Sequence, residues 1–469
     1  MTTTELTTTE LTATIARHIA LTPFSQLPTA TVEATKRSLL DGIGVMLAAS
    51  GSSPEVQPFV ELARTTGARG RASILGHGVR VSAPAAAFAN GAMAHALDYE
   101  DAFDAAPTHP NASLIPAALA IAQDVARVDG ETFLTAMAIG CDLTCRLGLS
   151  AGDGLEEGGW YPPPILGAFG ATAACARLLA LTPEQVSDAF SLLLCQATCP
   201  GEIKYTAASP IRAVREAFPA QAAVQAVMLA KQGIQGFSQP FEGRSGFFRL
   251  FAAGRYDAEP LLSDLGTRFW GERLSFKPWP CCRGTHAYIQ AARELRERHA
   301  LRWQDIARVT LVIGVVQRML CEPAAAKQSP TQPIDAKFSL PFTVATALIQ
   351  PDVTLDSFTP GALRDPDTLA LARAVHYEFR SDWGREHAAA GTVRIEMRDG
   401  TVLDHHVPQA VGHPDAPLDD ARLRAKFVAC AARAQQPCTR FQAEEFAKRI
   451  GQLTAHSDAG RALECVPGT

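Results

Sequence analysis

The residues best suited to chemistry in this chain lie together between Asn90 and Pro110, in the segment NGAMAHALDYEDAFDAAPTHP. An Ala-rich run that predicts a buried helix is followed by a Thr-His-Pro turn, and between them come four acids within seven residues: Asp98, Glu100, Asp101 and Asp104. Acids this close repel one another, and burial further disfavours their ionised form. A buried acid beside a histidine is what proton transfer requires. The pattern therefore predicts a proton-transfer site, with a capped helix–loop–helix turn as the alternative.

Cationic side chains recur in three further segments. They are Lys277, Arg283 and His286 in KPWPCCRGTH, Lys204, Arg212 and Arg215 within 202–215, and Lys337 near the start of an apolar helix. Cations beside an acid/His cluster suit a small carboxylate substrate, because they neutralise its charge and any enolate-like charge that develops. These residues also have alternative structural interpretations. Arg212 and Arg215 could form surface ion pairs, and the stem of Lys337 could lie along apolar surface. His286 could be a hydrogen-bonded histidine at a helix start.

The elements that must position these residues are mostly helices. Those expected in the first part of the chain are rich in alanine and apolar on nearly all sides, as in helices buried inside a large helical domain. They cover residues 31–49, 83–96, 113–126, 130–149, 167–179, 182–195 and 219–231. The sequence TPEQ predicts a capped helix start, with Thr182 as the N-cap and Gln185 at N3, and residues 71–81 predict a short hairpin.

The character of the sequence changes near Phe276. Residues 308–316 are β-branched and predict a strand, and residues 391–407 predict a hairpin around an Asp-Gly turn. Helices are expected at 285–298, 336–349, 365–375 and within 419–453. We therefore expect a mainly α fold. A large all-helical domain is formed by both chain ends, residues 1–270 and 409–469, and a smaller α+β lid domain, residues 271–408, is inserted between them.

Composition narrows the class of protein. The formal net charge is −5 without a basic run, which argues against nucleic acid or an anionic membrane as a partner. Eleven cysteines without a CxxC or zinc spacing predict buried, reduced thiols. The N-terminal residues lack the features of a secretory signal, and no window approaches about 18 apolar residues. We expect a cytoplasmic protein.

Common cofactor motifs are not found in the sequence. It has no GxGxxG after a predicted strand, no Walker loop, no HExxH and no GxSxG. We therefore expect neither a redox nor a nucleotide cofactor, and no metal.

Four segments together resemble the MmgE/PrpD family, which includes 2-methylcitrate dehydratase, cis-aconitate decarboxylase and iminodisuccinate epimerase. They are NGAMAHALDYED…THP at 90–110, GWYPPPILGAFGATAA at 159–174, KPWPCCRGTH at 277–286 and DAKFSLPFTVATAL at 335–348. The resemblance implies a large helical domain with an α+β lid, usually a homodimer, and cofactor-free chemistry in the cleft between the domains. It also implies a small polycarboxylate substrate and a proton moved at a carbon next to a carboxylate.

The family's functional positions carry over residue by residue. Asp98 matches the first acid of the family's DFDD motif, His109 the histidine of its HP turn, and Lys277 the lysine before an aromatic-Pro pair. Cys282 and His286 match the cysteine and histidine of that motif, and Arg215 falls where the family usually has lysine. The predicted catalytic residues are Asp98, His109, Tyr161, Lys277 and His286, and the predicted substrate-binding residues are Arg215, Lys204, Arg283, Cys282 and Phe342.

In this interpretation His109 is the base, Asp98 orients it, and Lys277 and Arg215 bind the substrate's negative charge. Asp104 is expected to be a solvated loop acid. Several aromatic residues predict a pocket less polar than usual: Phe218, Phe342, Trp160 and Trp279.

The chain also departs from the family pattern. Ala102 stands in place of Thr or Ser, Tyr161 in place of a histidine, Phe218 in place of another histidine, and Phe342 in place of a frequent tyrosine. These changes remove proton carriers. Three hypotheses follow: a cofactor-independent lyase that dehydrates or decarboxylates a non-standard carboxylate, an isomerase or epimerase of a small dicarboxylate, and a catalytically degenerate binding or scaffold protein. The spacing from Asp98 to His109 resembles that of the epimerase.

Overall fold

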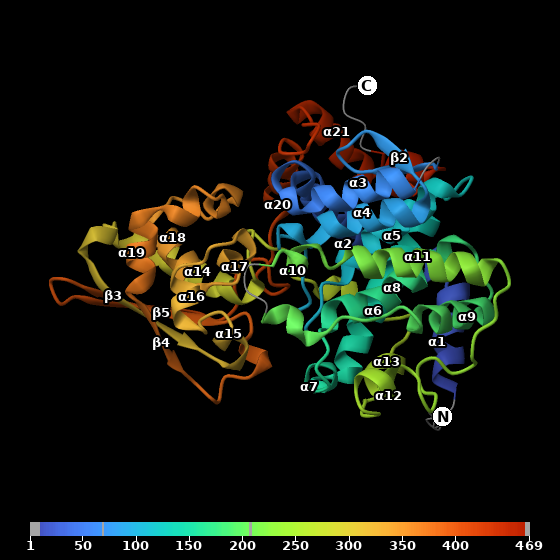
Figure 1. Cartoon of the computed structure of the whole chain (residues 1–469), viewed down its shortest axis with the longest axis horizontal. Coiled ribbons are helices and arrows are strands. Elements are labelled where there is room, and N and C mark those ends of the chain that lie inside the picture. The colour runs from blue at the N-terminus through green and yellow to red at the C-terminus, as the bar shows by residue number, and fades with distance from the viewer. Residues whose placement is uncertain (1–9, 68–69, 206–208, 465–469) are drawn as a thin grey trace.

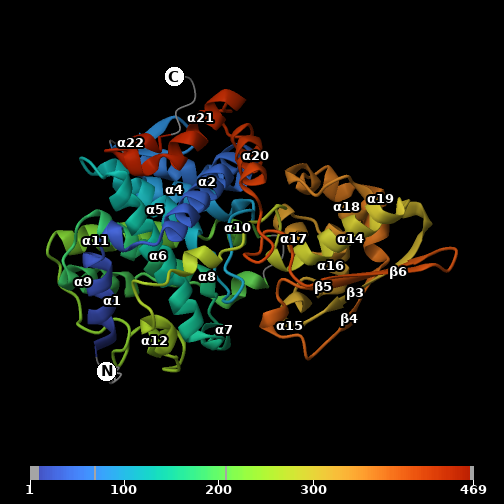
Figure 2. The same cartoon turned by 180° about the vertical axis from the view of Figure 1, so that it is seen from behind.

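The computed structural model describes residues 10–67, 70–205 and 209–464, so the first nine residues of the Thr-rich start lie outside the described residues. The fold is mainly α, as predicted. Figures 1 and 2 show a large helical body that is built from the first and last parts of the described chain, and beside it a smaller body that carries the main sheet. Each body has its own extensive hydrophobic core.

Buried helices form the centre of the helical body. These are α2 (Thr29–Ser52), α4 (Ala83–Ala96), α5 (Pro110–Asp124), α6 (Gly130–Ala151), α8 (Pro162–Leu178) and α11 (Ala217–Lys231). Small residues let their backbones approach closely: a Cβ at Gly170 would lie 2.3 Å from the carbonyl oxygen of Gly140. Glycine at such positions, among the abundant alanines, therefore makes close packing of this core possible.

Shorter elements surround that centre. They are α1 (Leu11–Leu21), α3 (Gln57–Thr66), α7 (Gly154–Glu157), α9 (Pro183–Leu194), α10 (Ile211–Val214), α12 (Phe247–Phe251) and α13 (Glu259–Leu262). The hairpin predicted at 71–81 is confirmed as β1 (Ala72–Ile74) and β2 (Val79–Val81). The capping box of α9 is also confirmed, with the Thr182 and Gln185 side chains each bonded to the other's backbone.

The second body contains a four-stranded sheet in the order β4-β3-β5-β6. Its strands are β3 (Ile306–Ile313), β4 (Val375–Phe379), β5 (Gly391–Met397) and β6 (Val402–Val407). Strand β3 is parallel to β4, with Val309 opposite Val375, and antiparallel to β5, with Leu311 opposite Val393. The accompanying helices are α14 (His286–His299), α15 (Val315–Arg318), α16 (Ala324–Gln328), α17 (Pro333–Lys337), α18 (Leu340–Ile349) and α19 (Pro366–Arg373).

Two predictions in this body were wrong in detail. The helix expected at 336–349 is divided into α17 and α18, because Ser339 caps the second helix: its Oγ accepts a hydrogen bond from the Phe342 N–H at 3.0 Å. The helix expected at 365–375 ends at Arg373, and strand β4, which follows at once, was not predicted.

The chain crosses between the bodies twice, and the crossings lie beside the acidic loop. Ser275 and Ala102 exchange backbone hydrogen bonds of 2.7 and 2.9 Å, and the Phe276 N–H donates to the Gly412 carbonyl at 3.0 Å. Gly412 has φ +94°, and a Cβ there would lie 1.9 Å from the Phe276 carbonyl oxygen, so only glycine fits. The chain then returns through α20 (Asp420–Ala431), α21 (Arg440–Gly451) and α22 (Ala459–Ala462).

Helix α6 corrects the expectation that no segment approaches the length and apolar character of a membrane span. It is long and apolar enough to cross a membrane by length and composition alone, but 89% of its apolar window is buried inside the protein. That is the behaviour of a core helix. Eight of the ten described cysteines are buried, the other two being Cys195, which is exposed, and Cys282, which is half-buried.

Candidate active site

The acidic loop begins where the buried helix α4 ends. Asp98 adopts a left-handed backbone conformation, with φ +49°, which residues other than glycine rarely adopt. The surroundings hold it there: the Asp98 N–H donates to the His95 carbonyl at 2.8 Å, and the Lys277 and Lys337 ammonium groups donate to the carbonyls of Asp98 and Leu97 at 3.0 and 2.8 Å. Lysines from the other side of the domain junction therefore fix this turn.

Asp98 and Lys277 form a fully buried ion pair. Lys277 Nζ lies 2.7 Å from Asp98 Oδ1, and both side chains are at most 1% exposed. Burial lowers the pKa of Lys277, but the Asp98 and Glu100 carboxylates outweigh it and raise that pKa above its usual value. Lys277 therefore stays cationic. Burial lowers the pKa of the neighbouring Lys337 to about 8.

His109 has the geometry of a general base. Its Nδ1 lies 3.0 Å from the Asp101 carbonyl oxygen and 3.2 Å from Glu100 Oε1. With acceptors at Nδ1, that nitrogen carries the proton and Nε2 carries the lone pair. Burial lowers the pKa of His109 well below its usual value, so the ring is neutral at neutral pH. Glu100 and the Asp101 carbonyl therefore orient His109, which corrects the prediction that Asp98 does so.

His95 is a second histidine in the cluster, and it is not among the predicted site residues. Its Nδ1 hydrogen-bonds to Glu100 Oε1, the same oxygen that faces His109, and the two rings lie 5.1 Å apart. Its Nε2 is buried, lies 3.8 Å from Asp98 Oδ1 and has no hydrogen-bond partner within the described ranges. The spacing of His95 and Asp98, three residues apart at a predicted helix end, is the signal that could have revealed it.

Asp101 lies behind His109. The Asn111 side chain donates to Asp101 Oδ2 at 2.6 Å. Burial, followed by the nearby Asp41 carboxylate, raises the pKa of Asp101 to about 8. Asp101 is therefore mostly protonated at neutral pH, and Glu100 is the carboxyl group of this loop that contacts both imidazoles.

A group of cationic and phenolic side chains lies close to the cluster. Arg215 is buried: its Nη1 donates to the Arg212 carbonyl at 2.7 Å and its Nε lies 3.1 Å from Glu216 Oε1. Its Nη2 is buried without a hydrogen-bond partner in the part of the chain that the structure describes. The Arg215 guanidinium lies 5.0 Å from the centre of the Tyr161 ring, and Arg212 Nη2 lies 3.5 Å from the Tyr161 hydroxyl.

Electrostatics link this group to the acids and histidines. After burial, the charge of Arg215 is the largest influence that lowers the pKa of His95, and it also lowers that of His109. A buried guanidinium with an unpaired nitrogen is well suited to bind a carboxylate. The arrangement can thus combine a neutral base with fixed cations.

Two residues of the predicted site make structural contacts instead. His286 is fully buried, with Nε2 3.2 Å from the Cys281 carbonyl oxygen and Nδ1 3.4 Å from Arg283 Nη1. Arg283 donates to Asp104 and to the carbonyls of Ala410 and Val411 at 3.1–3.2 Å. These contacts favour a positioning role for both residues, in place of the catalytic role predicted for His286 and the substrate-binding role predicted for Arg283.

Asp104 is likewise not a solvated loop acid. Besides Arg283, its Oδ2 accepts a hydrogen bond from Ser275 Oγ at 2.7 Å. Asp104 thus ties the end of the acidic loop to the crossing between the bodies.

The remaining predicted binding residues lie in different surroundings. Phe342 is a core residue of the smaller body, 1% exposed, which argues against the predicted contact with substrate. Cys282 is half-buried, and burial raises the pKa of its thiol to about 11, so it is not a thiolate. Lys204 pairs with Glu156 at 3.0 Å and lies 5.9 Å from the Tyr161 ring, at the edge of the Arg215 group.

The aromatic residues do not form the apolar pocket that was predicted. Phe218 is 51% exposed and packs on Phe59 and Phe88. Trp279 is buried, with its indole N–H 2.8 Å from Asp352 Oδ1, and Trp160 packs on Phe251. The groups around His109 are instead acids, lysines and arginines.

The histidines and acids also have donor atoms that a metal ion accepts. One ligand atom from each of His95, Asp98, Glu100 and His109 lies within 4.8 Å of the others. However, the Lys277 ammonium already binds Asp98, and Arg215 adds a second nearby positive charge. These fixed cations oppose a further cation, so the residues fit a metal ion less well than they fit proton transfer.

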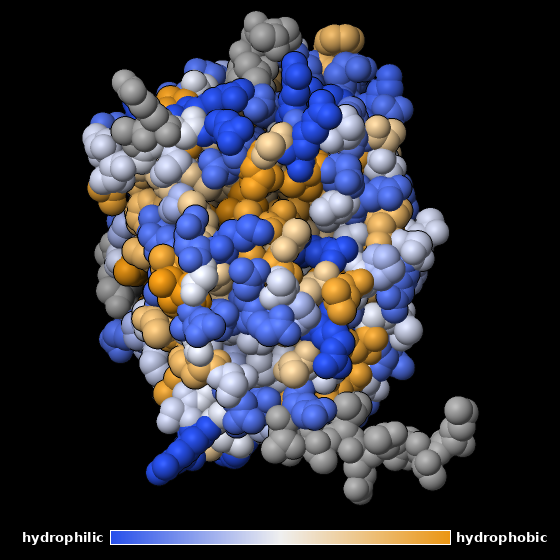
Figure 3. Space-filling view, turned by 90° about the vertical axis from the view of Figure 1, so that its right-hand side faces the viewer, coloured by the Kyte–Doolittle hydropathy of each residue, from blue (hydrophilic) through white to orange (hydrophobic). Residues whose placement is uncertain are grey.

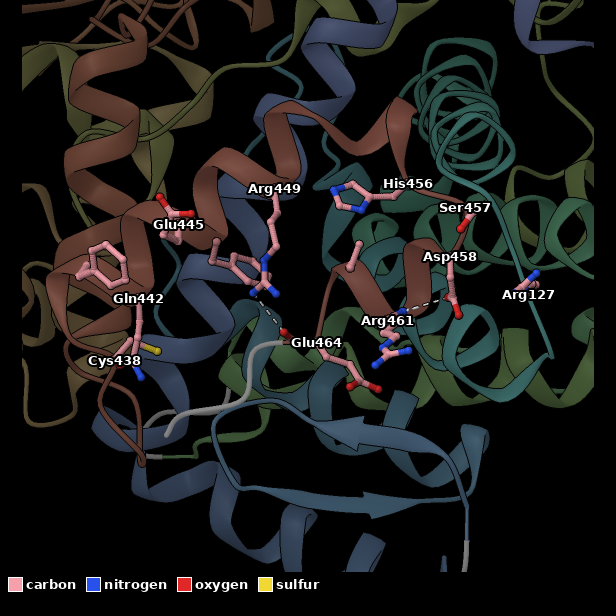
Figure 4. Close-up of a pocket in the computed structure, with 13 residues that line it drawn as sticks. Arg127, Cys438, Gln442, Glu445, Arg449, His456, Ser457, Asp458, Arg461 and Glu464 are labelled. Carbon is pink, nitrogen blue, oxygen red and sulfur yellow. Dashed lines mark hydrogen bonds between the residues drawn. The ribbon is translucent and has the colours of Figure 1, made fainter. Parts of the chain in front are cut away.

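A separate surface pocket of about 640 Å³ lies on another part of the helical body (Figure 4). Most of its lining comes from α21, α22 and the segment between them, and it includes the aromatic residues Phe441 and Phe446 as well as Arg449, Asp458 and Arg461. Arginines and acids are mixed along its walls, and it shares no residue with the His109 cluster.

Comparison with known proteins agrees with these motifs. Residues 13–259 match the model of the MmgE/PrpD N-terminal domain, and residues 279–449 match that of the MmgE/PrpD C-terminal domain. The chain belongs to the MmgE/PrpD family. The C-terminal match runs through the sheet-containing body into α20 and α21, so the family's second region spans both bodies.

Curated relatives resemble this MmgE/PrpD chain over most of its length. The cis-aconitate decarboxylase-like protein oryM of Aspergillus oryzae is 26% identical over 428 residues, 86% of each chain. Cis-aconitate decarboxylase of Aspergillus terreus is 23% identical over 94% of this chain and 93% of its own length, and that of Mus musculus is 24% identical over 86% and 83%. Decarboxylases are lyases, so these relatives support a lyase-type function at the level of the family.

Proposed function

We propose that this chain is a cofactor-independent lyase of a small carboxylate: it either dehydrates the substrate after abstracting a proton next to a carboxylate group, or decarboxylates it, with CO₂ leaving and a proton added to the carbon that loses it. The observation that carries the proposal is the environment of His109. Its Nδ1 faces Glu100 and the Asp101 carbonyl, which leaves Nε2 as a base, while the Lys277 and Arg215 cations lie within electrostatic reach.

In the proposed dehydration His109 Nε2 takes the proton from carbon. The electron pair of the broken C–H bond moves toward the adjacent carboxylate, and Lys277 and Arg215 stabilise the extra negative charge. In a dehydration this pair then forms a C=C bond while a β-hydroxyl leaves. The leaving oxygen needs a proton to depart as water.

Tyr161 is our candidate for that acid. Its hydroxyl oxygen lies 3.5 Å from Arg212 Nη2, which can donate to it, so its own proton remains free to be donated. Tyr161 is 7% exposed and lies beside Arg215. Because a phenol replaces the family's imidazole here, we propose a substrate that differs from the standard ones.

The second candidate function is isomerisation or epimerisation of a small dicarboxylate. The contacts of His286 favour it, because both ring nitrogens of this predicted catalytic histidine contact the protein and fewer acids remain to protonate a leaving group. An isomerase needs only to remove and return a proton on carbon.

Proton NMR in D₂O with a panel of di- and tricarboxylates separates the candidates. Vinyl signals or released CO₂ support the lyase. Deuterium incorporation without a new product supports the isomerase and refutes the lyase for that substrate. No change with any acid at high protein concentration would contradict both and favour a binding or scaffold protein.

We also propose a homodimer. Figure 3 shows hydrophobic side chains gathered on the face of the helical body remote from the sheet. Exposed large apolar residues of α11 and the loop after it include Phe218, Met228, Leu229, Ile234 and Phe237. Light scattering should give twice the chain mass of 50.0 kDa; a monomer at micromolar concentration would contradict the proposal.

A further inference from the structure

One buried lysine outside the His109 cluster joins three distant parts of the chain. Lys426, on α20, has a side chain only 5% exposed. Its Nζ donates to Asp41 Oδ1 at 2.6 Å, to the Tyr99 carbonyl at 2.6 Å and to the Lys277 carbonyl at 3.0 Å. An ammonium has three N–H donors, so these acceptors use all of them.

The two carbonyls belong to the segments that form the Asp98–Lys277 pair. Tyr99 follows Asp98 and precedes Glu100, and Lys277 supplies the ammonium itself. The Tyr99 side chain makes two further contacts: its ring centre lies 3.8 Å from Lys426 Nζ, and its hydroxyl donates to the Pro278 carbonyl at 3.1 Å. Lys426 therefore holds the backbone on both sides of the ion pair.

Asp41 supplies the opposite charge from α2. Its side chain is fully buried, and a charge is tolerated at such depth when it is paired and hydrogen-bonded. Helix α20 lies at the edge of the helical body that faces the sheet-containing body (Figure 2). Lys426 is thus anchored in the helical body and reaches the point where the chain first crosses to the other one.

We propose that Lys426, with Asp41, is a positioning residue of the active site, which keeps the Asp98 turn and the Lys277 segment in register across the domain junction. This inference rests on the proposed function, because it gives the relative position of the Asp98 turn and the Lys277 segment a role in catalysis. Without the three contacts, Asp98 in its left-handed conformation and Lys277 would lose the support that fixes their separation. Displacement of reacting groups by about 1 Å costs about 10²-fold in rate.

Hydrogen exchange read by mass spectrometry tests the positioning directly and needs no substrate. The reporters are the amides of Ala102, Ser275 and Phe276, which are hydrogen-bonded between the acidic loop and the crossings. In Lys426→Met they should exchange at least about tenfold faster. The matched control is Arg146→Met, which removes another buried cation, 1% exposed and paired with Asp142 on α6; it should leave these amides within about twofold of the wild type.

Kinetics on the substrate found in the D₂O panel give the second readout. Lys426→Met should lower kcat by about 10- to 100-fold with KM within about threefold, and Lys426→Arg, which keeps the charge, should recover part of the loss. Folded Lys426→Met with wild-type exchange and wild-type kcat would overturn the proposal, as would equal acceleration of the reporter amides in Arg146→Met.

Two further outcomes remain decisive. If Lys426→Met does not fold, Asp41→Asn replaces it, and unchanged exchange of the reporter amides in that variant overturns the proposal. If the wild type turns over no carboxylate, the proposed function fails, while the exchange comparison still shows whether Lys426 holds the two segments together.

Discussion

Replacing Glu100 by glutamine tests the assignment of His109 as the base. Glutamine keeps the size of the side chain but removes its charge, and its amide can donate toward His109 Nδ1, which favours the wrong tautomer. The Glu100 Oε1 atom lies 3.2 Å from His109 Nδ1. The change therefore acts on both the charge and the proton position of the ring.

The size of the effect follows from that distance. A full charge on His109 at 3.2 Å from the carboxylate would be stabilised by about 5 kcal/mol at an effective dielectric constant of about 20. Glu100 also contacts His95, and the charge of Lys277 opposes it at His109. We therefore expect a loss of about 3 kcal/mol of transition-state stabilisation, or about 10²-fold in kcat/KM.

The pH profile of kcat/KM adds a second prediction, the direction in which its acidic limb shifts. Activity needs neutral His109, so the acidic limb of the profile reports the pKa of His109 in the free enzyme. Burial lowers that pKa and the Glu100 carboxylate opposes the lowering. In Glu100→Gln the acidic limb should therefore move to lower pH, while the maximum falls.

Asp142→Asn is the matched control, because Asp142 is an equally buried carboxylate, paired with Arg146 at 2.5 Å on α6. It should lower the melting temperature without moving the acidic limb. Loss of activity in Glu100→Gln with an unmoved limb, or an activity equal to wild type, would refute the role given to Glu100 and with it the assignment of the base.

Three other variants extend the test. Lys277→Met should lower kcat/KM by at least about 10²-fold. The control Arg146→Met, which also removes a buried cation, should lower the melting temperature without a comparable loss of kcat/KM. Near-normal turnover by Lys277→Met would contradict its role. Arg215→Gln should raise KM for a dicarboxylate by about tenfold or more in steady-state kinetics, and an unchanged KM would exclude it from binding. Asp101→Asn should raise the melting temperature relative to wild type more at pH 8 than at pH 5. Folded Asp101 keeps its proton up to about pH 8, whereas unfolded aspartate loses it near pH 3.9, so stability falls across that window; a constant difference would refute this.

The sequence by itself determined most of the helices and the identity of the segments that meet at the site. Local signals predicted α4, α6 and α9 within a few residues: the apolar pattern for α4 and α6, and the Thr182–Gln185 capping signature for α9. The motifs also selected Asp98, His109 and Lys277, which the structure brings into one cluster, with Asp98 and Lys277 buried and His109 partly exposed. A local pattern could not show β4, since that strand directly follows a helix and is specified by its pairing with β3.

Only the tertiary structure decided which groups pair. Asp98 and Glu100 are both acids of one short loop, and their roles differ because Lys277, 179 residues away, bonds Asp98, whereas Glu100 contacts His95 and His109. His286 has the type and spacing of a catalytic residue, yet its ring nitrogens contact Arg283 and the Cys281 carbonyl. Lys426 and Asp41 carry no motif at all. Both side chains are buried, and a buried charge needs partners. Here those partners lie far apart in the sequence, so only the tertiary structure shows them.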